Sequence, residues 1–274
     1  MRLLKKIFDY YLEASIHVAL AIVSLTMVNG LWLNIHIPYE LIFFIFFGSV
    51  AAYNFVKNGP ELIRFKFSAA DNPSYAGMLV IVAGLFALWF GLMLPQKNLA
   101  ILAFLLIVIL LYTYPIAHSD KNLRSLGVLK VVLVAISWTT VTVYLLAVFE
   151  GSDWDWDLNI VALQTFLLVV SLIIPFEIRD MQFDPPDIRT IPRRIGVKWT
   201  KRLGILLIFL STFLLFLRDD ISKMEILLRG VLLIAVSLFI WMTPINYSKY
   251  YASFWIEAIP IFWLGLILGL CVIF

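Results

Sequence analysis

Long apolar runs constrain this chain more than any other feature of its sequence. A helix needs about 20 mostly apolar residues to cross the roughly 30 Å hydrocarbon core of a bilayer. Nine runs of about that length follow one another, separated by short segments that contain Pro, Gly and Asn. The runs cover approximately residues 14–33, 38–56, 75–94, 97–114, 126–149, 158–176, 202–217, 224–244 and 252–273. We therefore predict an all-α integral membrane protein, a bundle of nine transmembrane helices.

Composition supports this class and excludes others. Of the 274 residues, 62% are apolar and 14% charged, whereas a soluble domain carries about half apolar and a quarter charged residues. The net charge of +3 is too small for bulk binding of nucleic acid, so we expect the lipid bilayer as the surroundings and no nucleic-acid partner. Because the runs occupy nearly the whole chain, we predict one membrane-embedded domain over residues 1–274.

The basic residues predict the orientation. Cytoplasmic loops of membrane proteins are enriched in Lys and Arg. If the N-terminus is cytoplasmic and the chain crosses nine times, the outer side carries only Lys97, Arg218, Lys223 and Arg229 of the 21 basic residues, with Lys130 inside a span. We therefore predict a multi-pass protein with a cytoplasmic N-terminus and a C-terminus on the opposite side, in a bacterial inner membrane. The first run is long and lacks a cleavage site, which favours a retained helix over a signal peptide.

The loop after the sixth run concentrates acidic residues. If that helix continues to Asp184, the carboxylates of Glu177, Asp180 and Asp184 share one face near the membrane surface. Mg²⁺ commonly binds through one or two carboxylates together with phosphate oxygens of a substrate. The basic residues that follow could contact the same phosphates. The alternative is a solvated loop whose acids pair with its own arginines.

Two further predicted cytoplasmic loops carry polar residues that could contribute to the same site. Asn54, Asn58 and Glu61, after the second run, could form a second polar face, or could be ordinary helix-end residues. Lys121 and Arg124, after the fourth run, could join a phosphate site, or could reflect only the enrichment of basic residues in cytoplasmic loops.

Two charged residues, Lys130 and Glu257, fall in or near spans. A charge at the centre of a bilayer costs about 2.5–3.5 kcal/mol on insertion scales. We therefore expect each to face the interior of the bundle or to reach an interface.

The arrangement of these loops resembles the UbiA superfamily of intramembrane prenyltransferases. That family has an Asp-x-x-x-Asp motif followed by a basic residue, Thr, Pro and Gly. The matching residues here are Asp180, Asp184, Arg189, Thr190, Pro192 and Gly196. A second, weaker match is the Tyr-x-Tyr-Pro segment, which comprises Tyr112, Tyr114 and Pro115 and is followed by Lys121.

The first motif departs from the family pattern Asn-x-x-x-Asp-x-x-x-Asp. Asn54 is retained, but Asn58 stands at the first aspartate position and Leu62 at the second. Asparagine can ligate a cation through its carbonyl oxygen but adds no charge, and leucine cannot ligate at all. Glu61, one position early, could supply one ligand.

The resemblance implies a UbiA-like bundle that performs Mg²⁺-dependent transfer of a prenyl group from an isoprenyl diphosphate to a membrane-associated, lipophilic acceptor of aromatic type. It implies that Asp180 and Asp184 are the catalytic metal ligands. It further implies metal contacts from Asn54, Asn58 and Glu61, and diphosphate contacts from Asn54, Lys121, Arg124 and Arg189.

Two alternatives compete with this interpretation. One is a catalytically silent UbiA-like protein that binds lipid or a partner. The other is a small transporter, which the absence of an inverted repeat in the sequence disfavours. The intact second motif favours an enzyme, and the altered first motif favours the silent relative.

Overall fold

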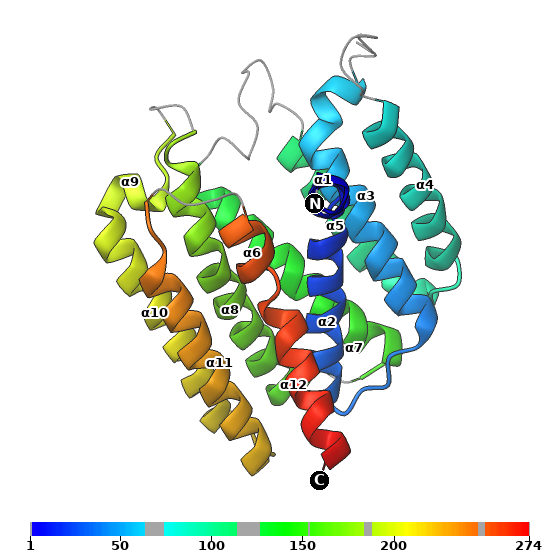
Figure 1. Cartoon of the computed structure of the whole chain (residues 1–274). Coiled ribbons are helices and arrows are strands. Elements are labelled where there is room, and N and C mark those ends of the chain that lie inside the picture. Colours follow the sequence, from blue (N-terminus) through cyan, green and yellow to red (C-terminus); the bar gives the residue numbers. More distant parts are fainter. Residues whose placement is uncertain are drawn as a thin grey trace.

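A computed structural model describes residues 2–63, 74–113, 127–152, 154–183, 188–245 and 250–273, with the side chains of residues 2, 58–63, 74–76 and 271–273 left out (Figure 1). Every regular element within these ranges is a helix. The α-helices are α1 (Arg2–Glu13), α2 (Ile16–Trp32), α3 (Tyr39–Ile63), α4 (Ser74–Gly91), α5 (Leu99–Thr113), α6 (Val128–Thr139), α7 (Leu145–Glu150), α8 (Trp156–Asp180), α9 (Ile191–Ile195), α10 (Val197–Phe213), α11 (Lys223–Met242) and α12 (Ile259–Ile273). The 3₁₀ segments are η1 (Gln96–Asn98) and η4 (Leu214–Leu217), and the π segments are η3 (Thr140–Tyr144) and η5 (Tyr251–Ile256).

The chain begins with two helices that meet at a bend of 56°. Ser15, between them, adopts a left-handed conformation (φ 60°), which few residues other than glycine adopt readily. The amphipathic helix α1 exposes Leu3, Leu4 and Ile7, whereas α2 is buried among its neighbours. Such an amphipathic segment is suited to the surface of a bilayer, because its apolar side can enter the lipid.

Helices α3 and α4 form a pair held by stacked aromatic rings. The ring centroids of Phe47 and Phe86 lie 4.8 Å apart, and those of Phe43 and Phe90 lie 5.1 Å apart. These stacks account for part of the aromatic content of the sequence without involving a ligand.

Helix α8 is the central element of the bundle, with contacts to α6, α10 and α11 (Figure 1). It is the most deeply buried of the candidate spans. The Asp155 carboxylate caps its N-terminus by accepting a hydrogen bond from the Leu158 amide at 2.7 Å. Near its other end Pro175 lies inside the helix, where it cannot donate a backbone hydrogen bond.

Helices α10 and α11 complete one side of the bundle. α10 approaches its neighbours at Gly204, where an added Cβ would lie 3.1 Å from both Ile174 of α8 and Ile240 of α11. The Ser171 hydroxyl of α8 also donates a hydrogen bond to the Gly204 carbonyl at 3.2 Å. The absence of a side chain at Gly204 therefore permits this close packing.

Two buried arginines, Arg218 and Arg229, lie near the start of α11. The Glu225 Oε1 atom accepts from Arg218 Nη1 at 2.6 Å and from Arg229 Nε at 3.0 Å. Arg218 also contacts Asp157 at the start of α8 and donates to the Trp32 carbonyl at the end of α2. This network, called the Glu225 charge network below, joins three helices at the end of the bundle opposite the last turn of α8.

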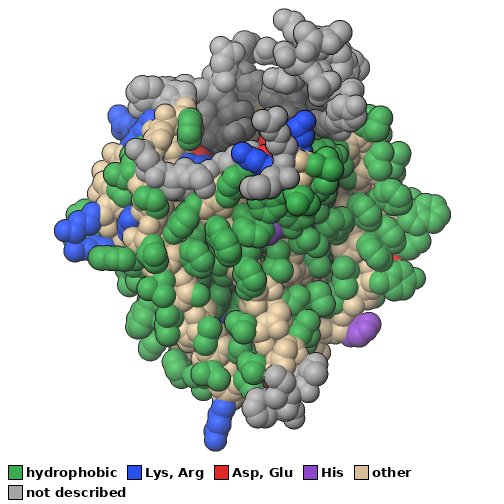
Figure 2. Space-filling model, viewed as in Figure 1, with side chains coloured by type: hydrophobic (Ala, Val, Ile, Leu, Met, Phe, Trp, Pro, Cys, Tyr) green, Lys and Arg blue, Asp and Glu red, His purple; other side chains and the backbone are tan. Residues whose placement is uncertain are grey.

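The surface and the helix lengths are those of a multi-pass integral membrane protein. Figure 2 shows apolar side chains over most of the visible face, with basic groups mainly toward one end. Each of the nine predicted runs falls on a helix. By length and composition, seven described helices could cross a membrane, or eight if the bent α1–α2 pair is one span. α4 has only the shorter apolar stretch Gly77–Gly91, so the predicted count of nine is not established.

Candidate functional site

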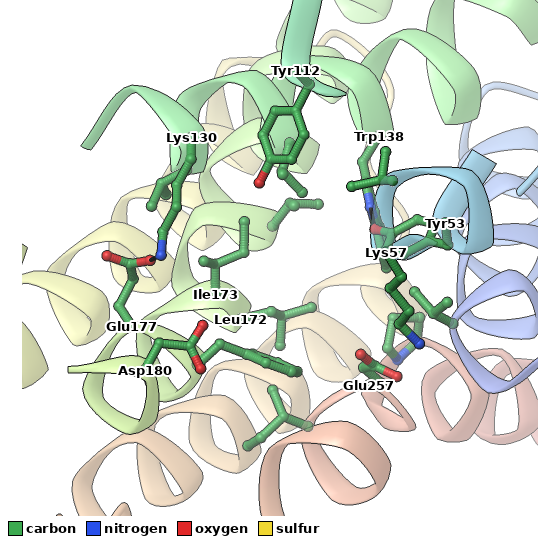
Figure 3. A pocket seen from close by; sticks show the side chains of 18 of the residues that line it. Tyr53, Lys57, Tyr112, Lys130, Trp138, Leu172, Ile173, Glu177, Asp180 and Glu257 are labelled. Carbon is green, nitrogen blue, oxygen red and sulfur yellow. Dashed lines mark hydrogen bonds and ion pairs between the residues drawn. The ribbon is translucent and has the colours of Figure 1, made fainter. Parts of the chain in front are cut away.

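A cavity of about 520 Å³ lies between helices of the bundle, beside the last two turns of α8 (Figure 3). Its wall is contributed by α2, α3, α5, α6, α8, the η5–α12 segment and the segment before α9. The lining residues are Val18, Tyr53, Val56, Lys57, Tyr112, Lys130, Val131, Val134, Trp138, Val169, Leu172, Ile173, Phe176, Glu177, Asp180, Ile188, Ile256, Glu257 and Pro260. Most of these are apolar or aromatic, and the charged ones fall into two groups on opposite sides.

The first charged group contains a buried ion pair between α6 and α8. Lys130 Nζ lies 2.8 Å from Glu177 Oε1, and the Glu177 side chain is 1% exposed. A charge in such surroundings is stable only when it is paired and hydrogen-bonded. The expectation that Lys130 faces the interior of the bundle is confirmed, because it reaches the cavity from within α6.

Asp180, the last residue of α8, lies one helical turn beyond Glu177 on the same wall. Arg179 binds its Oδ1 atom through Nε and Nη2, both at 2.8 Å. Arg179 is itself fixed by a hydrogen bond to Ser253 Oγ and by its position over the Phe176 ring, 5.1 Å from the centroid. Asp180 is therefore paired with a neighbouring arginine, as the alternative of a loop whose acids pair with its own arginines predicted. Asp180 is also part of the cavity wall.

The second charged group lies across the cavity and consists of Lys57 of α3 and Glu257, just after η5 (Figure 3). Lys57 Nζ donates to the Glu13 carbonyl at 3.2 Å and to Ser15 Oγ at 3.0 Å. Lys57 thus links the cavity to the bend between α1 and α2. Glu257 also faces the cavity, as expected for a charge in a spanning segment.

An aromatic contact fixes one corner of the cavity. The Trp138 indole Nε1 donates a 2.7 Å hydrogen bond to the Tyr53 hydroxyl, which joins α6 to α3. Together with Phe176 these rings present π-faces near the charged groups. Aromatic faces can stabilise a nearby positive charge.

The structure places the predicted residues of the first motif as follows. The Asn54 side chain is buried, and its Nδ2 donates to the carbonyls of Ala14 and Val50, both at 2.8 Å. It is not among the lining residues, so its described contacts connect α3 to the bend after α1. Asn58 and Glu61 lie in the last turns of α3, but their side chains are outside the described part of the structure.

Among the other predicted residues, only Asp180 and Arg189 have described side chains. Asp184, Lys121 and Arg124 lie outside the described residues. Arg189 is exposed, and its carbonyl accepts a 3.1 Å hydrogen bond from Arg194 Nε. The expected helix through Asp184 is corrected, because α8 ends at Asp180 and residues 181–183 form a turn. Among the described residues this helical face carries two carboxylates, those of Glu177 and Asp180.

Residues 188–190 pack closely against the start of α6. Gly127 has φ 59°, and an added Cβ there would lie 2.3 Å from the Arg189 carbonyl oxygen. Arg193 holds the same segment by donating to the carbonyls of Met181 and Ile188. Part of the basic cluster therefore supports the loop backbone.

The sequence placed Glu177 on the carboxylate face, but it assigned no ligand-binding role to the cavity residues Lys57, Lys130 and Glu257. Two signals in the sequence could have found them. Lys130 and Glu257 are charges inside apolar runs, and Lys57 follows Tyr53 at the i, i+4 spacing of one helix face.

No family model matches the sequence, and no curated protein matches it. Solved structures do match. A UbiA homologue from Archaeoglobus fulgidus bound to GPP and Mg²⁺ aligns with a TM-score of 0.64 over 93% of this chain and 96% of that chain, at 12% identity. A UbiA homologue of the same organism bound to DMAPP and Mg²⁺ gives 0.65 over 97% and 99%, at 11% identity. An apo UbiA homologue from Aeropyrum pernix gives 0.64 over 93% and 98%, at 16% identity.

The chain has the UbiA fold. At these identities the likeness establishes the architecture and leaves the activity to be argued from the site. The resemblance deduced from the Asp-x-x-x-Asp and Tyr-x-Tyr-Pro segments is confirmed at the level of the fold. Within the UbiA fold of this chain, one residue of each segment, Asp180 and Tyr112, lines the same cavity.

Proposed function

We propose that this chain is a member of the UbiA superfamily and transfers a prenyl group from an isoprenyl diphosphate to a lipophilic acceptor in the membrane, with Mg²⁺. The observation that carries the proposal is the division of the cavity. Charged groups line two sides of it, and apolar side chains form the rest of the wall. An isoprenyl diphosphate is divided in the same way, into a polyanionic head and an apolar tail.

Charge balance supports the need for a metal cation. The cavity wall carries Lys57 and Lys130 against Glu177, Asp180 and Glu257, with Arg179 beside Asp180. The described wall therefore has no excess of positive charge to neutralise a diphosphate. A divalent cation would supply that excess, and carboxylate oxygens are ligands of the type that Mg²⁺ prefers.

In this proposal Asp180 would hold Mg²⁺ together with the predicted ligand Asp184, and Asn58 and Glu61 are further candidates. Within the described residues no group of three or more His, Cys, Asp and Glu side chains is close enough to hold a metal, so the site depends on residues beyond them. Mg²⁺ would stabilise the charge that develops on the leaving diphosphate. Lys121, Arg124 and Arg189 remain proposed diphosphate contacts.

The described side chains have roles that follow from their positions. Lys130 presents its ammonium group to the cavity from the side of Asp180 and can bind diphosphate oxygens. The apolar wall formed by Val131, Leu172 and Ile173 would hold the prenyl tail and exclude water, which would otherwise capture the allylic cation. The two described hydrogen bonds of Asn54 Nδ2 support a structural role for this residue.

The experiment is binding of labelled geranyl diphosphate to the detergent-purified chain, with Mg²⁺ or with a chelator. We expect Mg²⁺-dependent binding in the parent protein and its loss in Asp180→Asn, because the amide removes a charged metal ligand. Asp219→Asn, at the opposite end of the bundle, is the matched control and should bind as the parent does. Unchanged binding in Asp180→Asn would contradict the assignment.

The silent lipid-binding relative has one observation in its favour, since Glu177 and Asp180 each already have a cation of the chain at 2.8 Å. It predicts binding of isoprenoids without dependence on Mg²⁺ and without release of pyrophosphate. Pyrophosphate release from geranyl diphosphate, measured together with binding, distinguishes the two functions.

A further inference from the structure

Glu257 is the cavity carboxylate to which the proposed function gives no role. It follows the π segment η5 and precedes α12, on the wall opposite Asp180 (Figure 3). A charged group inside a spanning segment is by default a functional candidate, because its insertion is costly.

Its contacts distinguish Glu257 from the structural carboxylates of this protein. Glu177 and Glu225 each bind a basic side chain directly, at 2.8 Å and 2.6 Å. In the part of the chain that the structure describes, the Glu257 carboxylate has no hydrogen bond or ion pair. The charged and titratable groups around it act at longer range, namely Lys57 on α3, Arg179 on α8, Tyr53 on α3 and Tyr11 on α1. A carboxylate kept in the cavity wall without a bonded partner is able to accept a proton or a hydrogen bond from a ligand.

The backbone that carries Glu257 is held firmly in place. Its amide donates to the Ala252 carbonyl at 3.3 Å, the i to i−5 pattern of a π-helix, and such segments are frequent at functional sites. η5 is anchored by Tyr251, whose hydroxyl donates to the Phe239 carbonyl of α11, and by Ser253, which binds Arg179 of α8. The carboxylate is thus presented from a fixed element.

The proposed reaction requires a group of this kind. When the allylic C–O bond breaks, its electron pair leaves with the diphosphate. The acceptor then donates an electron pair to the allylic carbon and must lose a proton from its nucleophilic hydroxyl or ring carbon. A carboxylate on the wall opposite Asp180 can take this proton from an acceptor bound beside it.

We propose that Glu257 is the catalytic base on the acceptor side of the cavity: it binds the nucleophilic group of the acceptor and takes its proton as the new bond to the prenyl carbon forms. This inference rests on the proposed prenyl transfer. Glu177 and Asp180 are unsuited to the role because both already bind cations on the diphosphate side.

The test uses the full-length chain purified in detergent, Mg²⁺, labelled geranyl diphosphate, and a total lipid extract of the source membranes as the acceptor. Three quantities are measured: bound label, label transferred into the lipid product, and geraniol formed by water. Glu257→Gln is compared with Glu257→Asp and with Glu150→Gln, the same amide change at an exposed position near the end of α7.

We expect Glu257→Gln to bind geranyl diphosphate and to form geraniol as the parent does, but to transfer the prenyl group about 100-fold more slowly, the usual contribution of general-base catalysis. Glu257→Asp should recover part of the transfer rate, and Glu150→Gln should match the parent. A purely structural role would lower all three quantities together.

The possible failures separate the two proposals. If the parent protein transfers label and Glu257→Gln transfers it equally fast, the role of Glu257 is wrong and prenyl transfer stands. The role is equally overturned if Glu257→Gln loses binding as Asp180→Asn does, because Glu257 would then belong to the diphosphate site. If the parent neither binds nor transfers label, the proposed function falls and the inference falls with it.

Discussion

The buried pair Lys130–Glu177 makes a prediction at the scale of single residues. Glu177→Gln leaves the Lys130 ammonium without the carboxylate now at 2.8 Å. Removal of one partner of a buried ion pair costs about 3–5 kcal/mol, and we expect the lower end, since Lys130 is 13% exposed. Thermal unfolding in detergent measures this loss.

The double substitution Lys130→Met with Glu177→Leu is the control for that prediction. Replacement of both charges by apolar side chains of similar size is often neutral or stabilising. We therefore expect the double variant to unfold nearer the parent temperature than Glu177→Gln does. Equal destabilisation of the two variants would mean that packing, and not charge, governs this position.

Single residues also show what the sequence could and could not predict about the site. Lys130 and Glu257 were expected to face the interior because a charge in a span is costly, and both line the cavity. Asn54 shows the opposite case. An amide near a helix end has the same sequence pattern whether it binds a ligand or a backbone carbonyl, and the described contacts of Asn54 Nδ2 are with the carbonyls of Ala14 and Val50. Only the tertiary contact distinguishes the two.

At the scale of elements, the close approach of α10 to α8 and α11 depends on Gly204. Gly204→Ala would place a methyl group 3.1 Å from Ile174 and Ile240, closer than ordinary contact. Overpacking of this kind typically costs about 1–3 kcal/mol. We expect a lower unfolding temperature for this variant.

The matched control for Gly204 is Gly230→Ala in α11, where an added Cβ meets nothing within 4 Å. Alanine is favoured over glycine inside a helix by about 1 kcal/mol, so this variant should be neutral or more stable. A similar decrease in stability for both variants would contradict the packing argument.

The ends of elements were predicted less well than their existence. All nine apolar runs fall on helices, because hydrophobicity sustained over some 20 residues is a strong signal. The sequence also allowed α8 to continue to the prolines after Asp184. It ends at Asp180 instead, and Arg193 binds the carbonyl of Met181 in the turn that follows. A contact between residues twelve positions apart cannot be read from local preference.

At the scale of the whole molecule, the Glu225 charge network and the cavity lie at opposite ends of α8. Glu225→Gln weakens the contacts of two buried arginines, Arg218 and Arg229. We expect a loss of stability of about 3–5 kcal/mol from the uncompensated buried charge. Thermal unfolding of this variant beside Glu150→Gln measures the loss.

Geranyl diphosphate binding by folded Glu225→Gln should match the parent at low temperature, because the substitution is remote from the cavity. A loss of binding without a loss of stability would show instead that the two ends of the bundle are coupled.

The network also explains why two of the four basic residues assigned to the outer side are not solvated loop charges. Arg218 and Arg229 are 7% and 4% exposed, which the charge rule alone does not predict.

Pro175 has a mechanical consequence for the cavity. Because Pro175 cannot donate to the carbonyl of Ser171, α8 lacks one backbone hydrogen bond just before the turn that bears Glu177 and Asp180. On the N-terminal side of Pro175, α8 packs closely against Gly204 of α10. On its C-terminal side, the last turn of α8 carries Glu177 and Asp180. This end of the cavity wall is therefore held by side-chain contacts, those of Glu177 with Lys130 and of Arg179 with Ser253, as well as by the backbone of α8.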